Sequence, residues 1–329
     1  MVFPGQGSQS VGMLGLLGAA HPVVRETFQE ASDVLGYDLW SVVGEGPEDA
    51  LNRTACTQPA MLVAGVAVWR AWRAAGGPEP TVLAGHSLGE YTALVCAGSL
   101  GFADAVALTR ARGTWMQEAV PVGVGAMAAI LGLDDDRVRA LCREGAGEQV
   151  VEAVNFNAPG QVVIAGHAQA VERTIALARA AGARRALPLP VSVPAHCRLM
   201  AAAARQLGER LRETDLRAPR IPVVQNADVC AFDDPEDIRA ALARQLDHPV
   251  RWVEGVQAMA ARGARTVLEC GPGRVLTGLV RRIDRGLTSR CIEDPRGLEE
   301  ALAGLATDTG SRVDDVGRAS PALQIPRRG

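Results

Sequence analysis

The sequence predicts an α/β fold in which a small domain is inserted into a larger one. An apolar run at 81–84 leads through a glycine-rich turn into a helix-like run at 88–97, which is a strand–turn–helix pattern. The order of the predicted elements changes over 121–193, where they follow the β-α-β-β-α-β order of ferredoxin-like domains. After His196 the alternation of helices and strands resumes, so the larger domain is predicted to be α/β and split by the insertion.

The chain opens on a short strand that runs into a glycine-rich loop at residues 2–9. The pattern Gly5-x-Gly7-x-x-Ser10 departs from the dinucleotide-binding fingerprint, because a serine stands at its third glycine. We therefore expect the loop to present backbone N–H groups near a site. Four helix-like segments are predicted in this half of the larger domain, over about 22–35, 58–75, 88–97 and 102–119.

The inserted domain is predicted to span 121–193. Its strand-like runs are 125–131, 150–155, 161–165 and 185–191, and its helices begin near 134 and cover about 168–181. The larger domain is assigned to 1–120 and 194–303, and 304–329 is expected to be a disordered tail because it is polar and aperiodic. The second half of the larger domain is expected to hold helices 198–213, 236–246, 250–262 and 273–285 and strands 221–225 and 265–270.

Composition excludes several classes of function. The net charge of −3 argues against nucleic-acid binding. All 34 basic residues are arginine, which excludes a Schiff-base lysine, a Ser-Lys dyad and a Walker-type phosphate loop. The seven cysteines lack metal-ligand spacing, which favours reduced thiols in a cytoplasmic protein. No apolar run is long enough to span a bilayer, so no membrane association is expected.

Gly85-His86-Ser87-Leu88-Gly89 has the Gly-x-Ser-x-Gly form of a nucleophile elbow. The flanking strand and helix are the context that this motif requires. We therefore predict that Ser87 is a nucleophile, exposed at the carboxyl end of a strand beside a helix N-terminus. The alternative is a serine that only caps the helix.

An activated serine needs a base, and the sequence offers five histidines. His196 follows the apolar segment 189–195, where the chain returns from the insertion, and such junctions commonly form clefts. His196 is therefore the predicted base, with a capping histidine ahead of helix 198–213 as the alternative. The other four are His86, whose side chain should point away from Ser87, His21 and His248, which precede prolines, and His167, which begins a helix of the insertion.

Arg112 is unusual because it falls within an apolar stripe of the helix at 102–119. A buried arginine is costly unless it meets an anion. Two interpretations remain open: an ion pair with a carboxylate of the protein, or an anchor that grips a substrate carboxylate. The stripe consists of Ala105, Leu108, Ala111, Trp115 and Ala119.

Further motifs accompany these residues along nearly the whole chain. They are Phe3-Pro4-Gly5-Gln6-Gly7-Ser8-Gln9, Thr57-Gln58-Pro59-Ala60, Gly85–Tyr91, Arg112-Gly113 with Met116-Gln117, Asn155–Gln161, Val193–Cys197, Gln245-Leu246 and Gly271-Pro272-Gly273. On these motifs the chain closely resembles, over residues 2 to about 302, the bacterial malonyl-CoA:acyl carrier protein transacylases of fatty acid synthesis.

The resemblance implies an α/β-hydrolase-like core with a ferredoxin-like insertion. It also implies that malonyl-CoA is the substrate and that malonyl passes through a serine ester to the phosphopantetheine thiol of acyl carrier protein. No metal or tightly bound cofactor is expected, and the protein is expected to be a monomer. By the same resemblance the site residues are Ser87 as nucleophile, His196 as base, Arg112 as carboxylate anchor, the backbone N–H groups of Gln6 and Leu88 as oxyanion hole, and the backbone carbonyl of Gln245 as orienter of the histidine.

Three other functions stay open at this point. A discrete acyltransferase for polyketide assembly would use the same chemistry, and a serine esterase or thioesterase would share the elbow. A catalytically silent carrier-binding protein is the third, although Ser87, His196 and Arg112 are intact. For the acidic carrier protein, a docking surface at Arg281 and Arg285 is weighed against an ordinary solvated helix face.

Overall fold

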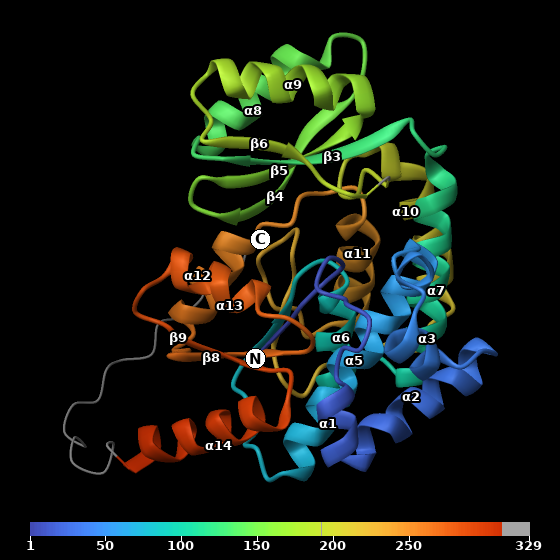
Figure 1. Ribbon diagram of the computed structural model, residues 1–329, viewed down its shortest axis with the longest axis vertical. Coiled ribbons are helices and arrows are strands. Elements are labelled where there is room, and N and C mark those ends of the chain that lie inside the picture. Colours follow the sequence, from blue (N-terminus) through green and yellow to red (C-terminus); the bar gives the residue numbers. More distant parts are fainter. Residues whose placement is uncertain (192, 311–329) are drawn as a thin grey trace.

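The computed structural model describes residues 1–191 and 193–310 and contains two β-sheets (Figure 1). The larger sheet is parallel, with the strand order β7-β2-β1-β8-β9. The first strand lies at its centre, so the loop that follows β1 emerges beside the turn that follows β2. The five strands are β1 (Val2–Phe3), β2 (Leu83–Gly85), β7 (Val223–Val224), β8 (Thr266–Cys270) and β9 (Thr288–Ile292).

Both faces of the parallel sheet are buried. Successive side chains of a strand point to opposite faces, so each strand contributes to two apolar clusters. Phe3 and Leu83 belong to one apolar cluster, whereas Val2 and Ala84 belong to another. The second cluster is closed by α12 (Trp252–Ala261) and α13 (Val275–Ile283). The first is closed by α1 (Gly15–Ala20), α2 (Pro22–Leu35), α3 (Leu39–Glu45), α4 (Glu48–Leu51), α5 (Thr54–Ala74), α6 (Gly89–Cys96), α7 (Phe102–Ala119), α10 (Ala201–Arg212) and α11 (Pro235–Gln245).

The smaller sheet is antiparallel and lies above the parallel sheet in Figure 1. Two helices cover its outer face over a separate apolar cluster that includes Ile130, Val138, Ile164 and Val171. The element order expected from the sequence over 121–193 is observed. In chain order the elements are β3 (Gly125–Leu131), α8 (Asp135–Ala146), β4 (Val151–Ala158), β5 (Gln161–His167), α9 (Ala168–Ala180) and β6 (Arg185–Pro188), with the strand order β4-β5-β3-β6.

The prediction that disorder begins at residue 304 is wrong, because α14 spans Pro295–Gly310. Asp294 starts this helix, accepting a hydrogen bond from the backbone N–H of Gly297 at 2.7 Å. Leu298 is buried, and Leu302 and Leu305 pack against the large core cluster. This apolar spacing supports a helix that extends past residue 304, where polar composition alone predicted the start of a disordered tail. The remainder of the predicted tail, 311–329, lies outside the described residues.

The helix at α13 also ends earlier than predicted. It stops at Ile283, so Arg285 lies beyond the helix and does not share a helical face with Arg281. The Arg281 guanidinium donates to the hydroxyl and the carbonyl of Ser289 on β9, each at 3.1 Å. Arg281 is therefore engaged within the protein, which weakens the sequence argument for a docking surface there. In the described part of the chain no helix is both long and apolar enough to cross a membrane.

We expect Phe28→Ala to lower the free energy of unfolding by about 3–5 kcal/mol, because it removes a large buried side chain. Phe28 is fully buried in α2 and packs edge-to-face on Trp40 with ring centroids 4.9 Å apart. The control is Leu16→Ala, since Leu16 is 73% exposed. Urea denaturation measures both variants, and equal stabilities would contradict the assigned core.

Candidate active site

Ser87 lies in a tight turn that requires glycine at two neighbouring positions. β2 ends at Gly85 and α6 begins at Gly89, and Ser87 between them has a φ of 51°, in the left-handed region. A Cβ at Gly85 would lie 1.9 Å from the Gly89 carbonyl group, and a Cβ at Gly89 would lie 2.1 Å from the carbonyl oxygen of Phe3. The two glycines of the motif are therefore required by close backbone contacts, as a nucleophile elbow demands.

Ser87 and His196 lie together as the sequence predicted. The Ser87 Oγ is 2.7 Å from Nε2 of His196, and Nδ1 of the same ring is 2.8 Å from the backbone carbonyl oxygen of Gln245. A carbonyl can only accept, so Nδ1 carries the proton and Nε2 is free to accept from the serine hydroxyl. The backbone N–H of His196 also donates to the Leu246 carbonyl at 3.0 Å, which fixes the histidine to the end of α11.

Burial keeps the His196 imidazole neutral. The side chain is almost fully buried, and desolvation, with a smaller contribution from the positive charge of Arg112, lowers the pKa of His196 to about 3. The hydrogen bond to the Gln245 carbonyl opposes this shift only partly. At neutral pH the ring is therefore available as a proton acceptor.

Arg112 is fully buried in α7, as its place in the apolar stripe predicted. Its Nη1 donates to Gln58 Oε1 at 2.6 Å, and its Nη2 donates to Gln245 Oε1 at 3.0 Å and lies 3.4 Å from Ser87 Oγ. The guanidinium carbon lies 5.4 Å from the centre of the Tyr91 ring. All these partners are neutral, and desolvation lowers the pKa of Arg112.

The expected alternative, an ion pair between Arg112 and a protein carboxylate, is not what the structure contains. None of the salt bridges formed within 1–191 and 193–310 includes Arg112. The Glu90 carboxyl acts on Arg112 electrostatically but forms no salt bridge with it. A buried cation whose hydrogen-bond partners are all neutral can bind an anion that comes from outside. The geometry thus favours the interpretation of Arg112 as an anchor for a substrate carboxylate.

Gln6 and Leu88 lie on the two backbone segments that meet at the elbow. The backbone N–H of His86 donates to the Phe3 carbonyl at 3.0 Å, and a Cβ at Gly5 would lie 2.4 Å from the His86 carbonyl oxygen. The loop that carries Gln6 therefore passes directly against the elbow. Among the contacts of the described residues, neither the Gln6 nor the Leu88 backbone N–H has a hydrogen-bond partner, which leaves both free to bind a ligand oxygen.

The site also includes Asn226 and Glu90, to which the sequence predictions gave no role. The Asn226 Oδ1 accepts from the backbone N–H of Ser87 at 2.7 Å, and the Glu90 carboxylate accepts from Asn226. A signal was available for Asn226, because it follows β7 at the edge of the sheet where β2 also ends. Glu90 stood inside the elbow motif, but nothing in the sequence showed that its helix position is fully buried.

The remaining histidines take other roles. The Nε2 of His86 lies 2.7 Å from Oδ1 of Asn157 on β4, so the smaller sheet contributes a side chain beside the elbow. His167 accepts the backbone N–H of Val150 within the smaller sheet, and His248 pairs with Asp247. His196 is thus the histidine in contact with Ser87.

A serine elbow, a neutral imidazole and an unpaired buried cation suit acyl transfer through a serine ester better than a hydrolase triad, in which a carboxylate orients the histidine. Comparison with known proteins agrees with this class. The model of the acyl transferase domain matches residues 1–307, and the chain belongs to this family.

Relatives named malonyl CoA-acyl carrier protein transacylase align with nearly the whole chain. The protein of Salmonella typhimurium is 56% identical over 301 residues, covering 92% of this chain and 97% of its own length. That of Bacillus subtilis is 42% identical over 305 residues, covering 92% and 96%.

Solved structures agree in fold. The acyl-carrier-protein S-malonyltransferase of Burkholderia pseudomallei superposes with a TM-score of 0.90 at 57% identity, covering 92% of this chain and 98% of that one. A malonyl-transacylase in complex with its type II PKS acyl-carrier protein superposes with a TM-score of 0.91 at 55% identity, with the same coverage.

We expect His196→Gln to flatten the pH dependence of stability between pH 3 and 6.5. The folded-state pKa of His196 is about 3 and its unfolded value is 6.5, so in this window the unfolded chain binds the extra proton. Stability therefore rises with pH at up to about 1.4 kcal/mol per unit in the wild type, and the variant loses this slope. Urea midpoints measured from pH 4 to 7 test this, and identical slopes in both proteins would contradict the buried neutral ring.

Proposed function

We infer that the chain catalyses malonyl transfer from coenzyme A to acyl carrier protein in fatty acid biosynthesis. The observation that carries this inference is the Arg112 guanidinium, buried among neutral partners with its Nη2 3.4 Å from Ser87 Oγ. An acyl group bound to Ser87 that bears its own carboxylate would supply the missing negative charge. The family membership and the names of the relatives support the same reaction.

The first half-reaction acylates Ser87. His196 Nε2 takes the hydroxyl proton as the serine oxygen attacks the thioester carbonyl of malonyl-CoA, and the backbone N–H groups of Gln6 and Leu88 receive the developing oxyanion. The tetrahedral intermediate collapses by breaking the C–S bond. The departing thiolate of coenzyme A takes the proton from His196, which leaves a malonyl ester on Ser87.

The second half-reaction runs these steps in reverse with a different thiol. His196 removes the proton from the phosphopantetheine thiol of acyl carrier protein, whose sulfur attacks the ester carbonyl. When the C–O bond breaks, the Ser87 oxygen recovers the proton from His196. One thioester replaces another, so the reaction is expected to be reversible and its kinetics ping-pong.

Gln245 serves this cycle through three atoms. Its backbone carbonyl holds His196 Nδ1 and stabilises the imidazolium that forms in each half-reaction, as a carboxylate does in hydrolase triads. Its side-chain oxygen meets Arg112 Nη2, and its Nε2 donates to the Ser87 carbonyl at 2.9 Å. Gln245 thereby links nucleophile, base and anchor.

We propose that this reaction proceeds without a metal or tightly bound cofactor. The chemistry needs no metal or tightly bound cofactor, because both reacting bonds are acyl bonds and one imidazole can move each proton. We propose a monomer that works in the cytoplasm on malonyl-CoA.

We propose that the parallel sheet with its helices is an α/β-hydrolase-like core assigned to 1–120 and 194–303, supported by the strand–elbow–helix at Ser87. We propose that 121–193 is a ferredoxin-like subdomain, supported by the antiparallel strand order β4-β5-β3-β6.

A second candidate function is malonyl transfer for polyketide assembly. It is favoured by the likeness to the malonyl-transacylase that was solved with its type II PKS acyl-carrier protein. The chemistry at Ser87 would be the same, and only the carrier protein would differ. Kinetic comparison of carrier proteins from the two kinds of pathway distinguishes these roles.

Intact mass measurement tests the proposed reaction directly. Mixing the protein with malonyl-CoA should add one malonyl group, absent in Ser87→Ala, and phosphopantetheinylated carrier protein should then remove it and gain the same mass. An adduct lost only to water would identify a thioesterase. No adduct with malonyl-CoA, acetyl-CoA or methylmalonyl-CoA would overturn the proposal.

We expect Arg112→Ala to reduce kcat/KM for malonyl-CoA by roughly tenfold to a hundredfold, the value of a hydrogen bond to a charged group. Transfer from acetyl-CoA, which lacks the carboxylate, should fall much less, so the ratio of the two substrates is the diagnostic quantity. Arg110→Ala on the same helix is the matched control, because Arg110 instead donates to the Leu35 carbonyl. An unchanged malonyl-to-acetyl ratio in Arg112→Ala would exclude the anchor.

A further inference from the structure

Asn226 holds the elbow at two backbone groups. Its side-chain oxygen accepts from the Ser87 N–H at 2.7 Å, and its side-chain nitrogen donates to the Gly85 carbonyl at 2.7 Å. One amide side chain thus spans the turn from the last residue of β2 to the nucleophile itself. Because Ser87 has a φ of 51°, its peptide N–H points where no helix or strand partner is available, and Asn226 supplies the acceptor.

Glu90 in turn holds Asn226. Its Oε2 accepts from the backbone N–H of Asn226 at 2.6 Å and from the side-chain Nδ2 at 2.5 Å. With Nδ2 fixed in this way, the Asn226 amide can present only its oxygen to Ser87. Glu90 is fully buried in the first turn of α6, one turn after the nucleophile, and Asn226 is nearly buried as well.

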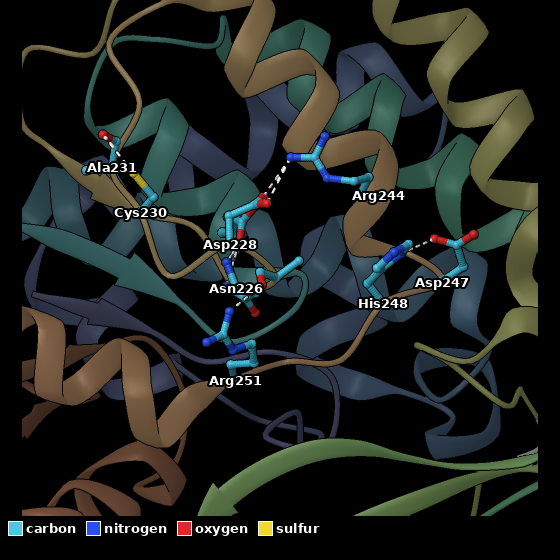
Figure 2. A network of polar contacts seen from close by, with 10 residues as sticks. Asn226, Asp228, Cys230, Ala231, Arg244, Asp247, His248 and Arg251 are labelled. Atoms are coloured by element: carbon cyan, nitrogen blue, oxygen red, sulfur yellow. Dashed lines mark hydrogen bonds and ion pairs between the residues drawn. The ribbon is translucent and has the colours of Figure 1, made fainter. Parts of the chain in front are cut away.

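The loop that carries Asn226 is fastened from two helices (Figure 2). Arg251, just before α12, donates through its backbone N–H to the Asn226 carbonyl at 3.1 Å and through Nη1 to the Ala227 carbonyl at 3.2 Å. Arg244 on α11 pairs with the Asp228 carboxylate at 2.9 and 3.0 Å. Asn226 is therefore a fixed point against which the elbow is held.

We propose that Asn226 and Glu90 are positioning residues for the proposed reaction: they hold the Ser87 backbone so that Oγ meets His196 and the Leu88 N–H faces the oxyanion. Their hydrogen bonds go to backbone groups of the elbow and to each other, and not to Ser87 Oγ. With the Ser87 N–H occupied by Asn226, the next amide, that of Leu88, is the one left without a partner at the helix start.

The ionisation of Glu90 is expected to make the positioning by Asn226 and Glu90 depend on pH. Burial raises the pKa of Glu90 to about 7, while the bonds from Asn226, a Gln245 contact on α11 and the Arg112 charge on α7 oppose the shift. Asp228, on the loop, adds to it. Above pH 7 the carboxylate accepts charge-assisted bonds from Asn226, and below pH 7 protonation weakens them.

The test measures the first-order rate of malonyl-serine formation by rapid quench and intact mass. We expect Asn226→Ala to slow this step by about tenfold to a hundredfold, with KM for malonyl-CoA changed less than about threefold, because Arg112 is untouched. Ser99→Ala is the matched control, since Ser99 makes a buried 2.7 Å bond to the Arg217 carbonyl away from the site. It should lose similar stability and keep the wild-type rate.

A pH series on Glu90→Gln separates positioning from a general structural role. The glutamine oxygen can still accept from Asn226 but cannot ionise, so the rate should stay within a few-fold of wild type and lose the rise between pH 6 and 8. A wild-type rate in Asn226→Ala, or a rise through pH 7 that persists in Glu90→Gln, would overturn the inference. If Asn226→Ala fails to fold, the Glu90→Gln profile alone decides.

The outcome is distinguishable from failure of the proposed function. If the wild-type protein forms no malonyl-serine, the proposed reaction itself fails. If the wild type is acylated and the two variants behave like it, only the positioning roles of Asn226 and Glu90 fail.

Discussion

The left-handed backbone at Ser87 is the constraint on which the rest of the site depends. A non-glycine residue is held there only if its surroundings favour that conformation over the relaxed alternatives. Gly85 and Gly89 remove the clashes, the Phe3 carbonyl accepts the His86 N–H, and Asn226 accepts the Ser87 N–H. These groups come from β1, β2, α6 and the loop after β7, so these three neighbouring strands of the parallel sheet must be in register before Ser87 is in place.

Desolvation shapes the chemistry of each titratable group around this turn. It lowers the pKa of His196, which leaves a neutral base, and raises the pKa of Glu90 toward neutrality. It also lowers the pKa of Arg112, although an arginine stays charged under these conditions. The three groups are buried and form no salt bridge with one another, and the side-chain oxygens of Gln58 and Gln245 accept hydrogen bonds from Arg112. Such an arrangement is costly for folding and useful for acid–base work.

Local sequence signals predicted the site better than they predicted the ends of elements. The elbow could be recognised because its glycines, serine and flanking strand and helix lie within about fifteen residues, and Arg112 because a charge interrupts an apolar stripe. Asn226 could not be placed in the site, because its role depends on the parallel pairing of β7 with β2, which joins residues far apart in the chain. The helix α14 was not predicted for a related reason: Leu302 and Leu305 pack on a core that is assembled from distant parts of the chain.

The guanidinium of Arg112 has a consequence for the order of stability along the reaction cycle. In the free protein the hydrogen-bond partners of this cation are neutral groups, and its interaction with the Glu90 carboxyl is not a salt bridge, so the unoccupied state carries an electrostatic cost. A malonyl group esterified to Ser87 would neutralise it and be released only when the carboxylate leaves with the next thiol. On this proposal the electrostatic free energy of Arg112 is higher in the free enzyme than in the acylated enzyme. If Arg112 has the proposed role, the covalent intermediate should therefore be long-lived and persist until a carrier protein binds.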